Sequence, residues 1–286
     1  MTTPPITLLR TLPISAASGL VAHGDFLFVV ADDEHHLSVL SRHDDNFHRT
    51  LRLFEGELPD QKKARKKQKP DLEALAHLPP SHQHPHGALL AIGSGSKPNR
   101  ERAVLVTLGA DGLPNANITT ITLGPLYQQL PFDDLNIEGA VVTGHTVRLL
   151  QRGNKGSNEN ALIHCTLESL LEGNPSPQIT TVSLPSMRGV PLGFTDACAL
   201  PDGRLLFSAV AEDTSDSYTD GACIATALGV LDASGNLQQL QMLPHPHKIE
   251  GIALANPHGT RLYAVTDADD PNVPAKLLGV EGWRNP

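Results

Sequence analysis

Five short segments along the chain each carry an oxygen-bearing side chain among small and apolar residues. These five side chains, here called the anchors, are Ser18, Glu73, Glu138, Asp196 and Glu250. Carboxylates brought close together repel one another and raise their own pKa values, unless a cation lies between them. Ca²⁺ takes about six to eight oxygen ligands and would fit such a set, whereas Mg²⁺ fits it less well. The alternative is that each anchor only accepts hydrogen bonds from neighbouring strand ends.

The spacing of the anchors indicates a repeat. They are separated by 55, 65, 58 and 54 residues, a period longer than that of a solenoid and typical of a propeller. After each anchor the same signals recur in the same order: a short apolar stretch, a turn, a second apolar strand, a polar loop, and third and fourth strands. The second strands, such as residues 26–30 and 205–210, carry few charges, as expected for strands buried on both faces.

The two ends of the chain are expected to meet in one sheet. The fifth segment holds only three strands, and the N-terminal residues 6–12 otherwise have no partner. An N-terminal strand that completes the last blade would close the ring. We therefore predict an all-β, single-domain, five-bladed β-propeller; a six-bladed propeller and an irregular β-sandwich are the alternatives. The predicted blades span about residues 15–56, 71–124, 136–185, 194–244, and 248–286 together with 5–13.

Composition excludes several classes of partner. With 22 basic and 31 acidic side chains, the formal net charge is −9, which argues against a nucleic-acid-binding protein. Three cysteines without metal-ligand spacing argue against a disulfide framework or a zinc site. No stretch approaches about 18 continuous apolar residues, and the N-terminus lacks the pattern of a secretory signal, so we expect no membrane partner and a cytoplasmic location.

Basic side chains gather in loops of two adjacent blades, which are expected to reach the same mouth as the anchors. Arg grips carboxylates and phosphates through two parallel hydrogen bonds, so these loops predict a small anionic ligand. Arg152 directly follows a buried strand; the alternative for it is an ion pair with Asp133, Asp134 or another carboxylate. The basic run at residues 61–69 is expected to be a solvated loop. The candidate ligand-binding residues are Lys97, Arg100, Arg102, Arg152, Asn154, Lys155 and His247.

The same mouth is expected to hold acidic residues from other loops. Asp32 and Asp33 follow the second strand of the first blade and are candidate general bases. The loops of the fourth and fifth blades add Glu212, Asp213, Asp267, Asp269 and Asp270.

The anchors also carry a resemblance. The pattern of a Ser and several acids at the start of successive inner strands of a five-bladed ring resembles that of the calcium-activated apyrases. In this chain, Asp196 stands where that family typically has another Ser or an acid. The resemblance implies a central Ca²⁺ and hydrolysis of nucleoside di- and triphosphates. The segments KPDLEAL (69–75), GSGS (93–96), QRGN (151–154) and GFTD (193–196) are similar to those of an uncharacterised bacterial family of predicted propellers, which implies no activity.

Together, these patterns favour Ca²⁺-dependent hydrolysis of a phosphoanhydride or phosphoester. In this hypothesis the negative charge that develops during the reaction is offset by Arg100, Arg102 and Arg152. The candidate catalytic residues are Asp32, Asp33 and Arg152. Two alternatives remain open. One is a non-catalytic scaffold that binds a protein or a small anionic ligand, and the other is a propeller-type esterase or lactonase. The oligomeric state is not defined by the sequence.

Overall fold

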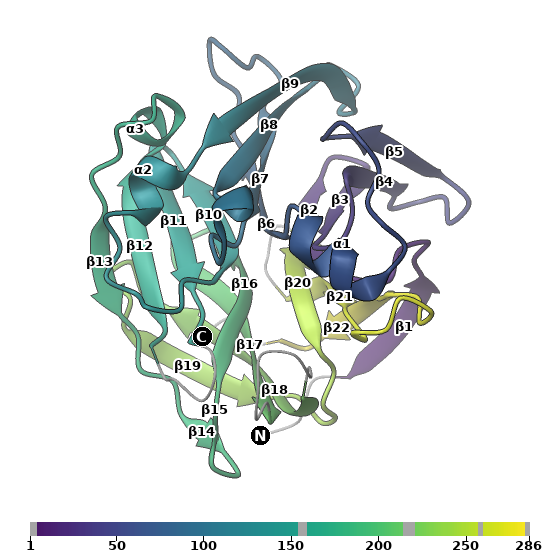
Figure 1. Cartoon of the computed structure of the whole chain (residues 1–286). Helices are drawn as coiled ribbons and strands as arrows, with labels where there is room; N and C mark the ends of the chain where they lie inside the picture. Colours follow the sequence, from purple (N-terminus) through teal and green to yellow (C-terminus); the bar gives the residue numbers. More distant parts are fainter. Residues whose placement is uncertain (1–4, 154–158, 214–220, 257–259, 284–286) are drawn as a thin grey trace.

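The computed structural model describes residues 5–153, 159–213, 221–256 and 260–283. The chain forms five antiparallel four-stranded sheets, or blades, arranged around a central axis (Figure 1). The predicted all-β, five-bladed propeller is confirmed.

The blades follow one another along the chain, and in blades 1 to 4 the first strand lies innermost and the last outermost. Blade 1 contains β2 (Ala17–His23), β3 (Phe26–Ala31), β4 (His36–Ser41) and β5 (His48–Arg52). Blade 2 contains β6 (Leu72–Leu78), β7 (Ala88–Gly93), β8 (Arg102–Leu108) and β9 (Pro114–Thr122). Blade 3 contains β10 (Ile137–Thr143), β11 (Thr146–Gln151), β12 (Ala161–Thr166) and β13 (Gln178–Thr181). Blade 4 contains β16 (Gly193–Ala199), β17 (Leu205–Asp213), β18 (Ala222–Leu231) and β19 (Leu237–Met242).

Blade 5 joins the two ends of the chain, as predicted. Its first three strands are β20 (Ile249–Leu254), β21 (Arg261–Thr266) and β22 (Lys276–Glu281), and its outermost strand is β1 (Ile6–Thr11). β1 pairs antiparallel with β22, with Thr7 opposite Gly279. This pairing closes the ring with backbone hydrogen bonds between residues far apart in the sequence.

Short elements decorate the loops. They are the helices α1 (Lys62–Gln68), α2 (Gly124–Tyr127) and α3 (Leu167–Leu171), the 3-10 turn η1 (Pro98–Arg100), and the two-stranded hairpin β14 (Ser186–Met187) and β15 (Val190–Pro191). The basic run expected to be a solvated loop is therefore helical over residues 62–68. Within the ranges given above, no helix is both long enough and apolar enough to span a membrane.

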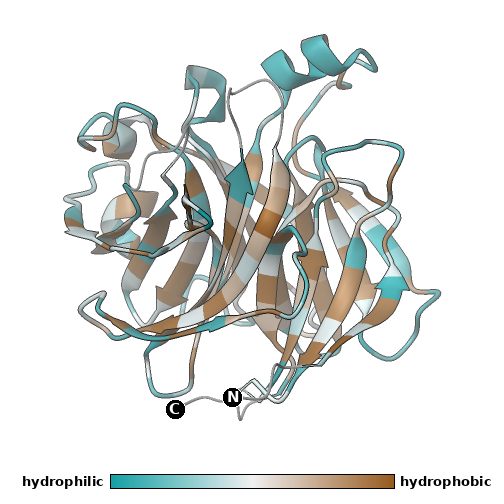
Figure 2. Ribbon diagram, turned by 90° about the horizontal axis from the view of Figure 1, so that it is seen from below, coloured by the Kyte–Doolittle hydropathy of each residue, from teal (hydrophilic) through white to brown (hydrophobic). Residues whose placement is uncertain are grey.

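The hydrophobic core is divided among the five boundaries between neighbouring blades. Each of five clusters draws its buried side chains from two adjacent blades; for example, one holds Leu90 of β7 with Leu149 of β11, and another holds Phe28 of β3 with Leu89 of β7. Figure 2 shows the apolar colouring along the strands and the hydrophilic colouring in many of the loops. The core therefore holds the blades rigidly around the axis and leaves the loop-bearing mouths to polar groups.

Candidate functional site

A β-bulge interrupts the inner strand of every blade at the same place. In β10, Ile137 pairs with Gln151 and Gly139 pairs with Leu150, so Glu138 is an extra residue without a partner of its own on β11. The same shift occurs in the other four inner strands. Bulges re-aim a side chain near an active site, and here the bulge of each inner strand includes one oxygen-bearing residue, although in β2 it spans both Ser18 and Gly19. We call this set the inner ring: Ser18, Glu73, Glu138, Thr195 and Glu250.

The register corrects one anchor. In β16, Phe194 pairs with Ala209 and Asp196 pairs with Ser208, which makes Thr195 the bulged residue. Asp196 therefore lies one position beyond the expected place and is equivalent to Gly139 and Gly251 in the neighbouring blades. Alternation along a strand reverses the side-chain direction at each residue, so an error of one residue changes what the side chain can reach.

Asp196 has a different set of contacts. It is fully buried, and its Oδ2 accepts a hydrogen bond of 2.8 Å from the backbone N–H of Ile252 in blade 5. Burial raises the pKa of Asp196 well above its usual range, although the backbone N–H groups of Ile252, Ala197 and Leu20 oppose the shift. Since these N–H groups belong to blades 5, 4 and 1, the carboxyl group lies close to three inner strands near the axis. Its Oδ1 has no hydrogen-bond partner.

Two cations lie among the acidic side chains of the inner ring. Arg152, which follows β11, donates to Glu138 Oε1 at 3.2 Å and to Glu212 Oε2 at 2.6 Å, and lies 4.0 Å from Glu250 Oε2. Lys248, which precedes β20, lies 3.4 Å from Glu212 Oε1 and 3.7 Å from Glu250 Oε1. Arg152 thus makes an ion pair, but with carboxylates other than Asp133 and Asp134.

The pKa values show that these cations compensate the buried charge unevenly. Burial raises the pKa of Glu212, but Arg152 and Lys248 outweigh it and hold the value below the usual range. Burial also raises the pKa of Glu138, and there Arg152 does not overcome it. The pKa values of Glu73 and Glu250 lie well above normal, with burial as the largest cause and Glu138 as a repulsive neighbour of both. Both oxygens of Glu250 lack a hydrogen-bond partner.

A second charged group adjoins the ring between blades 1 and 2. Lys69 forms an ion pair with Asp32 and lies 2.8 Å from Asp71 Oδ1, while Arg100 donates to Asp71 Oδ2 at 2.7 Å. Asp71 adopts a φ of 58°, an uncommon backbone conformation for a residue other than glycine. One carboxylate oxygen from each of Asp32, Asp71 and Glu73 falls within 4.8 Å of the others, so these three could share a metal ion.

The donor chemistry of this mouth fits a hard cation. Its side chains offer carboxylate and hydroxyl oxygens, which are the ligands of Ca²⁺ and Mg²⁺ rather than of softer metals. The buried oxygens of Glu250 that receive no hydrogen bond are suited to coordinate one.

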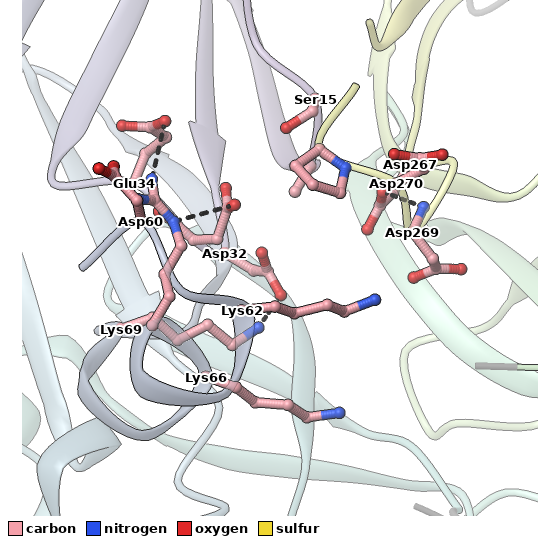
Figure 3. Close-up of a pocket in the computed structure, with 14 residues that line it drawn as sticks. Ser15, Asp32, Glu34, Asp60, Lys62, Lys66, Lys69, Asp267, Asp269 and Asp270 are labelled. Carbon is pink, nitrogen blue, oxygen red and sulfur yellow. Dashed lines mark hydrogen bonds and ion pairs between the residues drawn. The ribbon is translucent and has the colours of Figure 1, made fainter. Parts of the chain in front are cut away.

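A pocket opens at the same mouth, under helix α1. It has a volume of about 370 Å³ and lies between blades 1 and 5 (Figure 3). Its lining includes Asp32 and Asp33, the two candidate bases. Their pKa values are raised, chiefly by burial, while Lys69 and Arg65 respectively act in the opposite direction. Asp267 also lines the pocket, and burial raises its pKa to about 7.

The remaining candidate ligand-binding residues are placed elsewhere or used differently. Lys97 is exposed, and Arg100 is held by Asp71 and Ser96. Arg102 stacks over Phe54 at 4.9 Å and donates to Asn99 O. The backbone of His247 exchanges hydrogen bonds with the Thr226 hydroxyl. None of these four is among the described residues that line the pocket. Asn154 and Lys155 lie outside the described residues.

Sequence reasoning missed several polar residues of the mouth. Asp71, Asn136 and Lys248 each stand two residues before a ring residue, and residues two apart in a strand share a face. A polar residue two positions before a ring residue was therefore the sequence signal that could have identified them. Asn136 Nδ2 donates to Glu138 Oε1, which shows the contact that such a pair can make.

The fold and the site define a five-bladed β-propeller with a charged, partly buried central mouth. The chain belongs to a family of unknown function, DUF6929, whose model matches residues 13–281. Among curated proteins, no sequence matches this chain.

Solved structures resemble the chain in fold. A luciferin-regenerating enzyme superposes with a TM-score of 0.54 and 10% identity, over 98% of this chain and 96% of that one. A glutaminyl cyclase of Myxococcus xanthus superposes with a TM-score of 0.50 and 15% identity, over 97% of each chain. At such low identity the two likenesses show the propeller fold alone.

Proposed function

We propose that this chain is a hydrolase that binds Ca²⁺ at the inner ring and acts on a small phosphorylated molecule beside it. The observation that carries the proposal is the surplus of buried carboxylate at the mouth. Arg152 and Lys248 form ion pairs with Glu138, Glu212 and Glu250, while Glu73 and Asp196 make no ion pair with either cation.

A divalent cation would relieve this surplus. Buried carboxylates that face one another must either hold protons or gain positive charge. In this proposal Ser18, Glu73, Glu138, Thr195 and Glu250 hold the cation through oxygen atoms. The bound ion would supply positive charge that polarises a phosphoryl oxygen. Four of these residues, all but Thr195, are among the anchors that carried the resemblance to the calcium-activated apyrases.

The side chains around the ring have separate tasks in this scheme. Arg152 has two Nη groups, and we assign it to bind the anionic group of the substrate after exchanging part of its contact with Glu138. Among the pocket carboxylates, Asp267 has a pKa near 7, the range in which a general base works best at neutral pH. We therefore place Asp267 beside the sequence-predicted Asp32 and Asp33 as the group that accepts a proton from water.

One observation favours a non-catalytic alternative. The Arg152 guanidinium and the Lys248 ammonium already lie among the ring carboxylates, so the central charges could serve only to hold the blades together. In that case the loop face would bind a protein or a small anionic ligand without catalysing a reaction. A propeller-type esterase or lactonase would use the same mouth with a different substrate.

Metal binding is the first test. Ca²⁺ is titrated by calorimetry into protein stripped with EDTA, for the unchanged chain, for Glu138→Gln, and for Glu168→Gln as a control at an exposed position of helix α3. We expect about one Ca²⁺ per chain in the unchanged protein and the control, and a loss of affinity of about tenfold or more in Glu138→Gln. Absence of binding at millimolar Ca²⁺ would refute the cation site.

Substrate turnover is the second test. A nucleoside triphosphate, an aryl phosphate, an aryl ester and a lactone are offered with and without Ca²⁺. Ca²⁺-dependent release of phosphate supports the proposal. Turnover of only the ester or the lactone would indicate a propeller-type esterase or lactonase instead. Ca²⁺ binding without turnover of any substrate would support the non-catalytic scaffold.

A further inference from the structure

The pocket under α1 has walls from three parts of the chain. One wall is helix α1, in the connection between blades 1 and 2, and a second is the loop after β3 in blade 1. The third is the segment that follows β21 in blade 5. Figure 3 shows the side chains of these segments converging on one space. Its volume of about 370 Å³ falls in the range of small-molecule sites, roughly 300–1,000 Å³.

Some of the charges in the pocket are used to attach α1 to blade 1. Arg65 lies 3.3 Å from Asp33 Oδ2 and 3.3 Å from Glu34 Oε1, and its Nε donates to the Asp33 carbonyl at 3.0 Å. Lys69 pairs with Asp32 on the same side. These contacts fix the helix over the pocket and offset part of the negative charge on the blade 1 wall.

The two other walls carry opposite charges. Lys62 and Lys66 extend from α1 toward the side of the pocket on which Asp267, Asp269 and Asp270 lie (Figure 3). Over the whole lining, acidic side chains outnumber basic ones, although Asp269 on the blade 5 wall forms an ion pair with Lys248, which lies outside the lining. The acidic residues are Asp32, Asp33, Glu34, Asp60, Asp267, Asp269 and Asp270, and the basic residues are Lys62, Arg65, Lys66 and Lys69.

We propose that this pocket binds a zwitterionic small molecule, with its ammonium group against Asp267 and Asp270 and its carboxylate or phosphate against Lys62 and Lys66. In protein without a bound cation, the acidic excess would repel a ligand that is only anionic, and the two lysines would repel one that is only cationic. A molecule with both charges satisfies both walls. The inference does not depend on a cation at the inner ring.

Binding of ω-amino acids tests the inference, because this series keeps both charges and varies only their separation. β-Alanine, γ-aminobutyrate and ε-aminocaproate are titrated by calorimetry into protein in EDTA, with butylamine and butyrate as probes of one charge each. We expect one member of the series to bind about tenfold more tightly than either single-charge probe. Butylamine binding as tightly as the best amino acid, or no binding by any member, would overturn the inference.

Variants of α1 locate the site. Lys62→Gln/Lys66→Gln removes the charges that face the pocket, and Lys63→Gln/Lys67→Gln removes as many charges from positions of the same helix outside its lining. We expect the first pair to weaken binding by about tenfold and the second to leave it nearly unchanged. Asp270→Asn should weaken it as well. Equal losses of affinity in both lysine pairs would mean that binding depends only on long-range charge and not on contacts in the pocket, which contradicts the proposal.

Discussion

Arg152 Nη2 lies 2.6 Å from Glu212 Oε2, so a guanidinium at the end of β11 in blade 3 pairs with a carboxylate on β17 in blade 4. The same guanidinium also contacts Glu138 in its own blade and approaches Glu250 in blade 5. One arginine thus compensates charge from three blades. Losing Arg152 would remove the ion pair of Glu138 and leave Glu212 and Glu250 with Lys248 alone.

Replacing Arg152 by Met should destabilise the fold. Breaking a buried ion pair leaves uncompensated charge and costs about 3–5 kcal/mol. Urea unfolding at pH 7 measures the loss, and the deficit should shrink at acidic pH as the carboxylates take up protons. Arg152→Lys should fall between the two, because one ammonium cannot reproduce the forked contact. A loss below about 1 kcal/mol in Arg152→Met would mean that the network contributes little.

The register of β16 predicts that Thr195, and not Asp196, contributes to a cation site. Thr195→Val should therefore weaken Ca²⁺ binding by about tenfold or more, whereas Thr195→Ser keeps the hydroxyl and should bind normally. Asp196→Asn keeps an oxygen that can accept from Ile252 N and should leave Ca²⁺ affinity nearly unchanged. Calorimetric titration compares the three variants. Weakened Ca²⁺ binding in Asp196→Asn with normal binding in Thr195→Val would mean that Asp196 is the cation ligand, and would contradict the bulge assignment.

Asp267 should make stability fall as the pH rises toward neutrality. Burial raises its pKa from an ordinary value of 3.8 to about 7. Between these values the folded chain holds a proton that the unfolded chain has released. Raising the pH through this window therefore favours unfolding. Asp267→Asn, which cannot ionise, should show a weaker decline in unfolding free energy from pH 4 to pH 7. Parallel pH curves for the variant and the unchanged protein would refute the shifted pKa.

Gly251 should tolerate no side chain. A Cβ placed there would lie 2.2 Å from the Ser18 carbonyl oxygen of blade 1, whereas a Cβ at the equivalent Gly139 would lie 3.1 Å from Asp196 Cα. Gly251→Ala must therefore push two inner strands apart, and overpacking of this kind typically costs about 1–3 kcal/mol. Thermal unfolding should show a larger loss for Gly251→Ala than for Gly139→Ala. Equal melting temperatures would show that the closing seam between blades 5 and 1 is loosely packed.

The sequence was sufficient to predict the fold because its signals are local and repeated. Gly24 and Gly144, which lie in the predicted turns, adopt positive φ values of 55° and 57° between first and second strands. Glu73, Glu138 and Glu250 also occupy the predicted places at the start of the inner strands. The helix at residues 62–68 was missed. It buries no residue, so it lacks the apolar stripe from which a surface helix is usually predicted.

What the sequence by itself determined is the repeat: five blades, an N-terminal strand that closes the last one, and one oxygen-bearing residue at the head of most inner strands. Only the tertiary structure decided which charges meet. The bulge that selects Thr195 over Asp196 depends on pairing with β17, and the contacts of Arg152 with Glu212 and of Lys69 with Asp32 join residues 60 and 37 positions apart. Hydrophobic periodicity records which face of a strand is buried. It carries no information about which ionic groups face one another across a blade boundary.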